Sequence, residues 1–272
     1  MNIPAYAKGS YVHLDPSTEP WRQFFGLVLA ISVREIKGRY RRSVLGVAWA
    51  ILPPVFYAGV FSVLQGILHI STGEIPYVLF AYAGLVPWAF FVNAVNRCGT
   101  SIETNSGIVK KVAVPREVFP VAAVLTALVD FAVSSLLLAG LLTWFQVSVG
   151  SEVMWLIPLL LILASFALGV GLIVAALGTF VKDVLFGLPL VMQLWLLSTP
   201  IMYPLTQVPS SWGLLYTLNP MVGIIEGFRQ VVIGHQPPDF ALLVVSVGAT
   251  VVVWAVGWPL FRTMSQHFAD VI

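Results

Sequence analysis

Charged side chains are scarce in this sequence of 272 residues: Asp, Glu, Lys and Arg make up 10% of it, against about 25% in ordinary globular proteins. Hydrophobic residues make up 58%. A soluble fold of this size could not cover its surface with so few charges, so the composition indicates an integral membrane protein. The net charge of +2 is also too small for a protein that binds nucleic acid.

Cysteine and histidine are also scarce, which argues against two further kinds of site. Cys98 is the single cysteine, so the chain can form no intrachain disulfide. The four histidines lie far apart and show no metal-ligand spacing. The sequence has no Gly-x-x-x-x-Gly-Lys-Ser/Thr motif, and we expect no cofactor in this chain. If the protein uses ATP and Mg²⁺, a separate subunit would have to bind them.

Long segments with few or no acids and bases divide the chain into candidate spans. A 22-residue helix is about 33 Å long, which is enough to cross a hydrocarbon core of roughly 30 Å. We therefore predict an all-α integral membrane protein with six transmembrane helices, contained in a domain over residues 43–262. The predicted spans lie near residues 45–68, 76–96, 118–146, 154–181, 185–204 and 240–261.

The basic residues predict the orientation of these spans, because translocation of short loops disfavours Lys and Arg. With six spans, every Lys and Arg except Arg229 falls on one side. We therefore expect a multi-pass protein of the cytoplasmic (inner) membrane with both termini in the cytoplasm. The cytoplasmic tails are then 1–20 and 263–272, and the first of them lacks the pattern of a cleaved signal peptide.

Two segments do not have the pattern of a span. In residues 21–42, apolar side chains share one helical stripe and bases another, but the apolar run over 24–33 is too short to cross. We predict an amphipathic helix in the membrane interface there. The outer segment 205–239 has two short apolar pieces broken at Asn219-Pro220, which predicts a re-entrant helical pair between the fifth and sixth spans. An ordinary ordered outer loop is the alternative.

Several motifs occur together in the order in which one transporter family has them. The run over 34–49 reads Arg-Glu-Ile-Lys-Gly-Arg-Tyr-Arg-Arg-Ser-Val-Leu-Gly-Val-Ala-Trp and is followed by Pro53. Further motifs are Tyr77 with Gly84-Leu85-Val86-Pro87-Trp88, Lys111-Val112 with Pro115, and Asn219-Pro220-Met221 with Arg229. From about Trp21 to Arg262 the chain resembles the polysaccharide-exporting permeases of ABC transporters (ABC-2 type), the membrane subunits that export O-antigen, teichoic acid and related lipid-linked glycans.

The resemblance implies a transport subunit without catalytic residues of its own. In such permeases two copies of the chain pair with two ATP-hydrolysing subunits, and a glycan on a polyprenyl diphosphate passes between the two copies. O-antigen is the first expectation for the substrate, with teichoic acid or capsule next. The inner loop 97–116 is expected to carry a short coupling helix, and the outer helical pair is expected to gate the exit.

Basic residues supply the candidates for two of these roles. Guanidinium groups bind phosphate oxygens bidentately. The candidates for a lipid diphosphate or headgroup site are Arg34, Lys37 and Arg39. The same charges are also explained by their role in fixing the topology and by anionic headgroups. The candidates for the contact with the ATPase are Lys110, Lys111 and Arg116. A solvated basic loop is the alternative for them.

Aromatic residues and the broken outer segment supply the candidates for the sugar path and its gate. Flat aromatic faces suit a conduit through which sugar rings slide. The candidates for lining this channel are Phe56, Tyr57, Trp88 and Trp195, for which ordinary helix packing is the alternative. The candidates for the outer gate are Asn219, Pro220, Glu226 and Arg229. Glu226 and Arg229 are three residues apart and could form an ion pair on one helix.

Asp130 lies near the middle of the predicted third span, where a charge costs at least about 2.5–3.5 kcal/mol. Such a carboxylate is expected to face protein or water. A structural hydrogen bond to Ser134, Thr126 or a neighbouring helix is favoured over a proton relay, because no other predicted span has a central acid or base.

Three other functions stay open at this point. A permease for a drug or a small lipid would share the topology. A membrane-embedded enzyme acting on a polyprenyl-linked sugar would need paired acids or a base near the interface, and the outer acids are scattered. A secondary transporter would be expected to show an inverted repeat and an ion site, and neither is visible. The sequence therefore favours a transport subunit that is not an enzyme.

Overall fold

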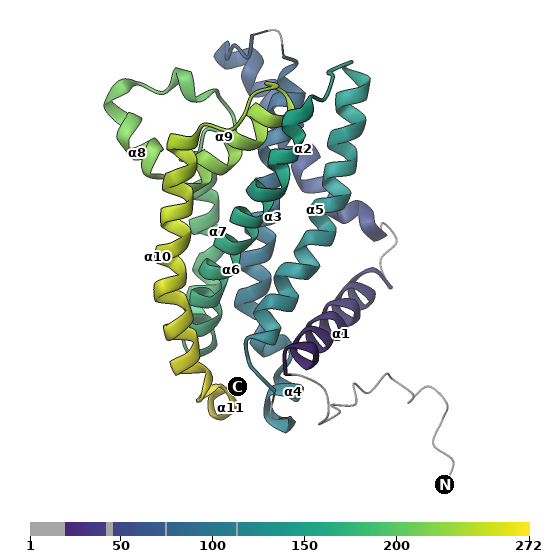
Figure 1. The fold of residues 1–272 in the computed structure, drawn as a ribbon, viewed down its shortest axis with the longest axis vertical. Helices are drawn as coiled ribbons and strands as arrows, with labels where there is room; N and C mark the ends of the chain where they lie inside the picture. Colours follow the sequence, from purple (N-terminus) through teal and green to yellow (C-terminus); the bar gives the residue numbers. More distant parts are fainter. Residues whose placement is uncertain (1–19, 42–45, 74, 113) are drawn as a thin grey trace.

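Helices make up the regular structure of the chain. The computed structural model describes residues 20–41, 46–73, 75–112 and 114–272 (Figure 1). The predicted tail 1–20, apart from Pro20, and residues 42–45 of the 34–49 motif lie outside the described residues. Within the described ranges, every regular element is an α-helix or a 3₁₀-helix, as predicted.

The α-helices are α1 (Pro20–Tyr40), α2 (Leu52–Leu68), α3 (Tyr77–Thr104), α4 (Ser106–Lys111), α5 (Val118–Trp144), α6 (Leu156–Phe180), α7 (Lys182–Leu197), α8 (Gly213–Leu218), α9 (Pro220–Val232), α10 (Phe240–Ser265) and α11 (Phe268–Val271). The 3₁₀-helices are η2 (Gly46–Ala50), η3 (Ser151–Trp155), η4 (Leu205–Gln207) and η5 (Ser210–Trp212). We call the end of the bundle with α8 and α9 the outer end, and the end with α4 and α11 the inner end (Figure 1).

Four of the described helices are long and apolar enough to cross a membrane: α3, α5, α6 together with η3, and α10. They occupy the predicted second, third, fourth and sixth spans. α2 and α7 occupy the places of the first and fifth spans, but with 17 and 16 residues they are only about 26 and 24 Å long. Prolines explain their limits, because Pro53 and Pro54 lie in the first turn of α2 and α7 ends before Pro200.

The inner connection between α3 and α5 is shorter than the predicted loop 97–116. α3 continues to Thr104, so Arg97 lies inside this helix rather than at the start of a loop. The charge does not end the helix because the long side chain of Arg97 reaches a buried carboxylate of α5. The expected short helix is present in the remaining connection as α4.

The outer segment is helical on both sides of the predicted break. α8 ends at Leu218 and α9 begins at Pro220, whose missing N–H is not needed at the first position of a helix. α9 packs against α3 and α10 and is almost fully buried, whereas α8 is largely exposed. The two helices therefore have different environments: α9 belongs to the packed outer end of the bundle and α8 covers its surface.

An apolar cluster, which we call the inner core, joins the inner ends of the helices. Its buried members include Val28, Ile31, Val109, Phe261 and Phe268. α1 runs obliquely along the inner half of α5 (Figure 1), and the Ser32 hydroxyl donates to the carbonyl of Ala122 at 3.1 Å. The fully buried Phe268 of α11 belongs to the same cluster, and α11 contacts α4. α1, α4 and α11 are thus held together by one core.

α3 is the central helix and contacts α2, α5, α6, α7 and α9. It approaches α6 closely at Gly171, where an added Cβ would lie 2.6 Å from the Cβ atom of Cys98. Small residues permit such close approach of helices in membranes. The pair Gly171 and Cys98 therefore sets the distance between two of the spanning helices.

Replacing Gly171 with alanine is expected to lower the free energy of unfolding by about 1–3 kcal/mol, because the two helices must move apart. Thermal unfolding of the purified protein in detergent measures this loss. The control is Gly140→Ala on α5, where an added Cβ meets nothing within 4 Å. The double variant G171A/C98G should recover part of the stability. A double variant as unstable as G171A would contradict the assignment of the clash to Cys98.

Candidate functional site

A groove of 240 Å³ lies between α2, α3 and α7. Tyr57 of α2 and Trp88 of α3 contribute aromatic rings to its lining. Three amide side chains contribute hydrogen-bonding groups: Asn93 and Asn96 of α3 and Gln193 of α7. The groove therefore combines flat apolar faces with groups that can both donate and accept hydrogen bonds.

The four predicted channel aromatics divide into two groups. Tyr57 and Trp88 line the groove. Phe56 lies on the surface of α2 with 72% of its area exposed. Trp195 packs with its ring centroid 5.1 Å from that of Phe91, and its indole N–H donates to Asn219. Its polar and ring contacts therefore support a structural role between α7 and the outer segment.

Sequence reasoning missed the three amides of the groove. Asn93, Asn96 and Gln193 lie in segments without any charge, where a polar side chain is costly unless it faces protein or water. Asn93 and Asn96 are three residues apart and therefore share one face of α3. This spacing could have revealed the groove from the sequence, because amides on one face of an apolar span indicate a polar path.

Arg34, one of the candidate phosphate ligands on α1, is bonded to the junction of α3 and α4. The Arg34 guanidinium donates to the side-chain oxygen of Asn105, the buried residue between α3 and α4. The Asn105 amide nitrogen donates in turn to the Ser101 carbonyl at 2.8 Å and to the Glu35 carboxylate at 3.3 Å. Asn105 thus joins α1 to the start of α4, a link that could not be inferred from local spacing.

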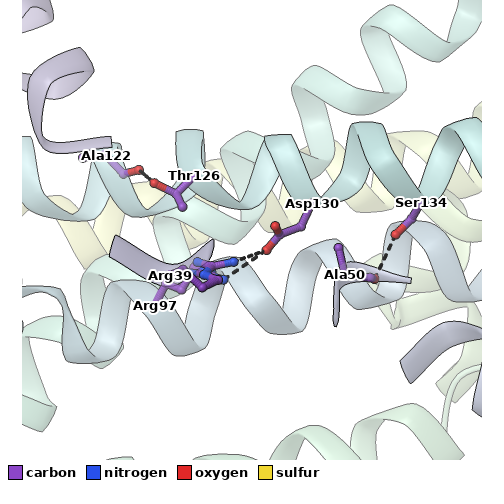
Figure 2. A network of polar contacts seen from close by, with 7 residues as sticks. All are labelled: Arg39, Ala50, Arg97, Ala122, Thr126, Asp130 and Ser134. Carbon is purple, nitrogen blue, oxygen red and sulfur yellow. Dashed lines mark hydrogen bonds and ion pairs between the residues drawn. The ribbon is translucent and has the colours of Figure 1, made fainter. Parts of the chain in front are cut away.

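Arg39 has a different partner, Asp130 in the middle of α5. Its guanidinium donates to Oδ2 of Asp130 at 2.6 Å, and Arg97 of α3 donates to the same oxygen at 3.0 Å (Figure 2). Of the predicted partners for Asp130, a neighbouring helix is therefore correct. Figure 2 shows where the other two bond: Thr126 donates to Ala122 and Ser134 donates to Ala50.

A second groove, of 760 Å³, lies along α1. Its basic lining residues are Arg34, Lys37 and Arg41. The other side is apolar and includes Ile108, Val114 and Val118 from the α4 region and the start of α5. A row of cations beside an apolar floor can hold an anionic head group and the hydrocarbon next to it. Lys37 and Arg34 are exposed there, whereas Arg39 faces Asp130.

The candidate ATPase contacts lie at the inner end. Lys110 and Lys111 form the exposed end of α4, while Val109 of the same helix is buried in the inner core. Arg116 lies between α4 and α5 and donates to the Val112 carbonyl at 3.4 Å. α4 therefore presents two ammonium groups from a helix that is fixed on its other side.

Arg229 is buried with 4% of its area exposed and lies at the centre of a polar cluster at the outer end. Its two terminal nitrogens donate at 2.6 Å to the carbonyls of Pro200 and Ile201, just after α7. The guanidinium also lies over the ring of Phe80 in α3. The predicted pair with Glu226 is present, with 3.0 Å between Nη1 and Oε1. Burial lowers the pKa of Arg229, and the Glu226 carboxylate opposes that shift.

Asn219 makes a second connection between α7 and α9. Its side-chain oxygen accepts the N–H of Met221 at 3.1 Å, which caps α9, and the indole N–H of Trp195 at 3.0 Å. Its amide nitrogen donates to the Thr199 hydroxyl at 3.0 Å. With Pro220 at the first position, the Asn219-Pro220 break both starts α9 and holds the outer end of α7.

Comparison with known proteins gives one family. The chain matches the family described as ABC-2 type transporter over residues 26–233. It is 29% identical over 258 residues to the O-antigen export system permease protein RfbA of Myxococcus xanthus, covering 92% of this chain and 96% of the relative. It is 26% identical to RfbA of Klebsiella pneumoniae, covering 91% and 95%. It is 28% identical to the polysialic acid transport protein KpsM of Escherichia coli, covering 88% and 93%.

Proposed function

The chain belongs to the ABC-2 type transporter family, and we propose that it is the permease subunit of an ATP-driven exporter for a polysaccharide carried on a polyprenyl diphosphate. The similarity to O-antigen export permeases and to a polysialic acid transport protein supports a polysaccharide, with O-antigen before teichoic acid or capsule. In this proposal the chain performs no chemistry. A separate ATPase subunit binds ATP and Mg²⁺.

The groove between α2, α3 and α7 is the observation that carries this proposal. Aromatic faces such as Tyr57 and Trp88 pack against the C–H faces of sugar rings, and amides such as Gln193 exchange hydrogen bonds with sugar hydroxyls. A drug or small-lipid permease would not need three amides along one apolar path. The groove is open to one side of the chain, and a second copy facing it completes the conduit.

The shortness of α2 and α7 fits a place beside this conduit. In the six-span topology that we propose, the first crossing includes η2 before α2, and the fifth includes the irregular residues 198–204 after α7. Irregular backbone is tolerated at membrane depth only where it lines a cavity or is covered by protein. The carbonyls of Pro200 and Ile201 satisfy this condition, because Arg229 covers them.

Coupling to ATP hydrolysis is mechanical in this proposal. Two ATPase subunits dock on α4 of two permease copies, with Lys110, Lys111 and Arg116 at the contact. α1 and α4 move together, because Asn105 and the shared inner core join them. The groove along α1, with Arg34 and Lys37, receives the diphosphate and the adjoining lipid. At the outer end α9, held by Asn219, Glu226 and Arg229, closes the exit.

Replacing Gln193 with leucine is expected to lower export about 3–10-fold, the loss of roughly one hydrogen bond to each passing sugar. The measurement is the rate at which surface polysaccharide appears in a host whose own copy of the gene is deleted and replaced by the variant. Leu194→Ile, at the exposed neighbouring position of α7, is the control and should export normally. If deletion of the gene leaves surface polysaccharide unchanged, the substrate class is wrong. If deletion of the gene stops export but Q193L exports at the normal rate, the groove is not the path of the polysaccharide.

A further inference from the structure

Two guanidinium groups meet one carboxylate in the inner half of the bundle. Arg39 and Arg97 donate to the same oxygen of Asp130, at 2.6 and 3.0 Å (Figure 2). The two arginine side chains are each 26% exposed, whereas the carboxylate is 7% exposed. An anion arriving from outside the cluster can therefore reach the cations, while Asp130 stays behind them.

Arg97 has donor capacity that its carboxylate partner does not use. Its Nε atom is buried and has no hydrogen-bond acceptor among the described residues. A guanidinium offers five N–H donors in a planar fork, which matches the oxygens of a phosphate group better than a single carboxylate oxygen. A buried donor without an acceptor is costly in a finished structural ion pair. It is expected where a ligand completes the set.

The position of Arg97 on α3 places this cluster next to the groove between α2, α3 and α7. Asn96 precedes Arg97 directly, and Asn93 lies one turn before it, about 6 Å along the helix axis. Both amides line the groove between α2, α3 and α7. Arg39, near the end of α1, lies in the chain between Gly38 and Arg41, which both line the basic groove. Each arginine of the cluster is therefore a chain neighbour of residues that line one of the two grooves.

We propose that Arg39 and Arg97 form a subsite for a diphosphate group, and that Asp130 is a resident competitor for the same donors. The inference rests on the proposed function and adds Arg97 and Asp130 to the substrate site. A diphosphate bound by two bare arginines would be held tightly. Asp130 weakens this binding because it competes for the N–H groups and repels the incoming anion. The carboxylate thereby lowers the net charge of the empty cluster from +2 to +1 and lets the substrate leave.

The test is equilibrium binding of radiolabelled inorganic pyrophosphate to the purified full-length permease in detergent. Asp130→Asn removes the competing charge and should tighten binding about 10-fold, whereas Arg97→Gln should weaken it about 10-fold. Arg262→Gln, which removes an exposed charge from the last turn of α10, is the control and should leave binding unchanged. Pyrophosphate affinities of D130N and R97Q equal to that of the unmodified protein would overturn the proposal.

Two further binding measurements test the fork of Arg97 and the identity of the ligand. Arg97→Lys keeps the charge but loses the fork, so its affinity should lie below that of the unmodified protein even if D130N proves too unstable to purify. Equal affinity of R97K and the unmodified protein would contradict a bidentate site. Farnesyl diphosphate should compete with pyrophosphate, and phosphatidylglycerol at the same concentration should not. Equal competition by phosphatidylglycerol would overturn the assignment to a diphosphate. All these readouts are independent of surface polysaccharide, so failure here leaves the export test intact.

Discussion

Replacing Arg229 with methionine is expected to lower the free energy of unfolding by about 3–5 kcal/mol, the usual cost of removing one partner of a buried ion pair. The change leaves the Glu226 carboxylate without its cation at 14% side-chain exposure. It also leaves the carbonyls of Pro200 and Ile201 without their side-chain donor. Loss of these bonds weakens the attachment of the end of α7 to α9, where the contacts of Asn219 are kept. Thermal unfolding in detergent, followed by size-exclusion chromatography, measures the effect.

Arg262→Met is the matched control, because Arg262 is exposed in the last turn of α10 and its loss should change stability little. Adding Glu226→Gln to Arg229→Met removes the stranded charge, so the double variant should be more stable than R229M alone. An unfolding temperature of R229M close to that of R262M would show that the cluster of Arg229 does not hold α7 to α9.

The features that sequence reasoning predicted correctly are those with a local cause. Stretches with few or no charges predicted α3, α5, α6 and α10, because a charge inside a span is costly in free energy. The Asn219-Pro220 break was predictable because proline cannot continue a helix whose preceding residue is extended. The Glu226–Arg229 pair followed from helical spacing alone.

The features that sequence reasoning missed depend on how the helices are rotated against one another. Asp130 and Arg39 are 91 residues apart, and no periodicity in either helix indicates that they meet. The charge pattern predicts a loop at Arg97, because a base commonly marks the end of a span, but the side chain of Arg97 is long enough to reach a carboxylate within the bundle. Trp195 is an aromatic residue inside a predicted span, as expected for a channel lining, but its indole N–H donates a hydrogen bond to Asn219. Such contacts follow from tertiary packing and not from local pattern.

Reversing the charge of α4 by the double substitution Lys110→Glu and Lys111→Glu is expected to lower export more than 100-fold while leaving the permease folded. Both side chains are exposed, and the opposite side of α4 is fixed by Val109 in the inner core and by contacts with α11. The substitution therefore alters the surface that we propose as the docking site of the ATPase and not the helix beneath it. Like charges brought together at an interface cost several kcal/mol, and each 1.4 kcal/mol is a factor of ten in affinity.

The measurement that separates docking from folding is made on two quantities in the same cells: surface polysaccharide, and ATPase subunit recovered with the tagged permease. Reversal at α4 should lower both, while the unfolding temperature of the purified permease stays within about a degree or two of normal, as for most surface substitutions. Arg262→Glu reverses a charge on α10 near the inner end and should change neither quantity. If K110E/K111E retains its ATPase subunit and exports normally, α4 is not the contact through which ATP hydrolysis is coupled to export. We would then expect the coupling to run through α1, which is connected to the bundle by its bonds to Asn105, Asp130 and Ala122 and by the inner core.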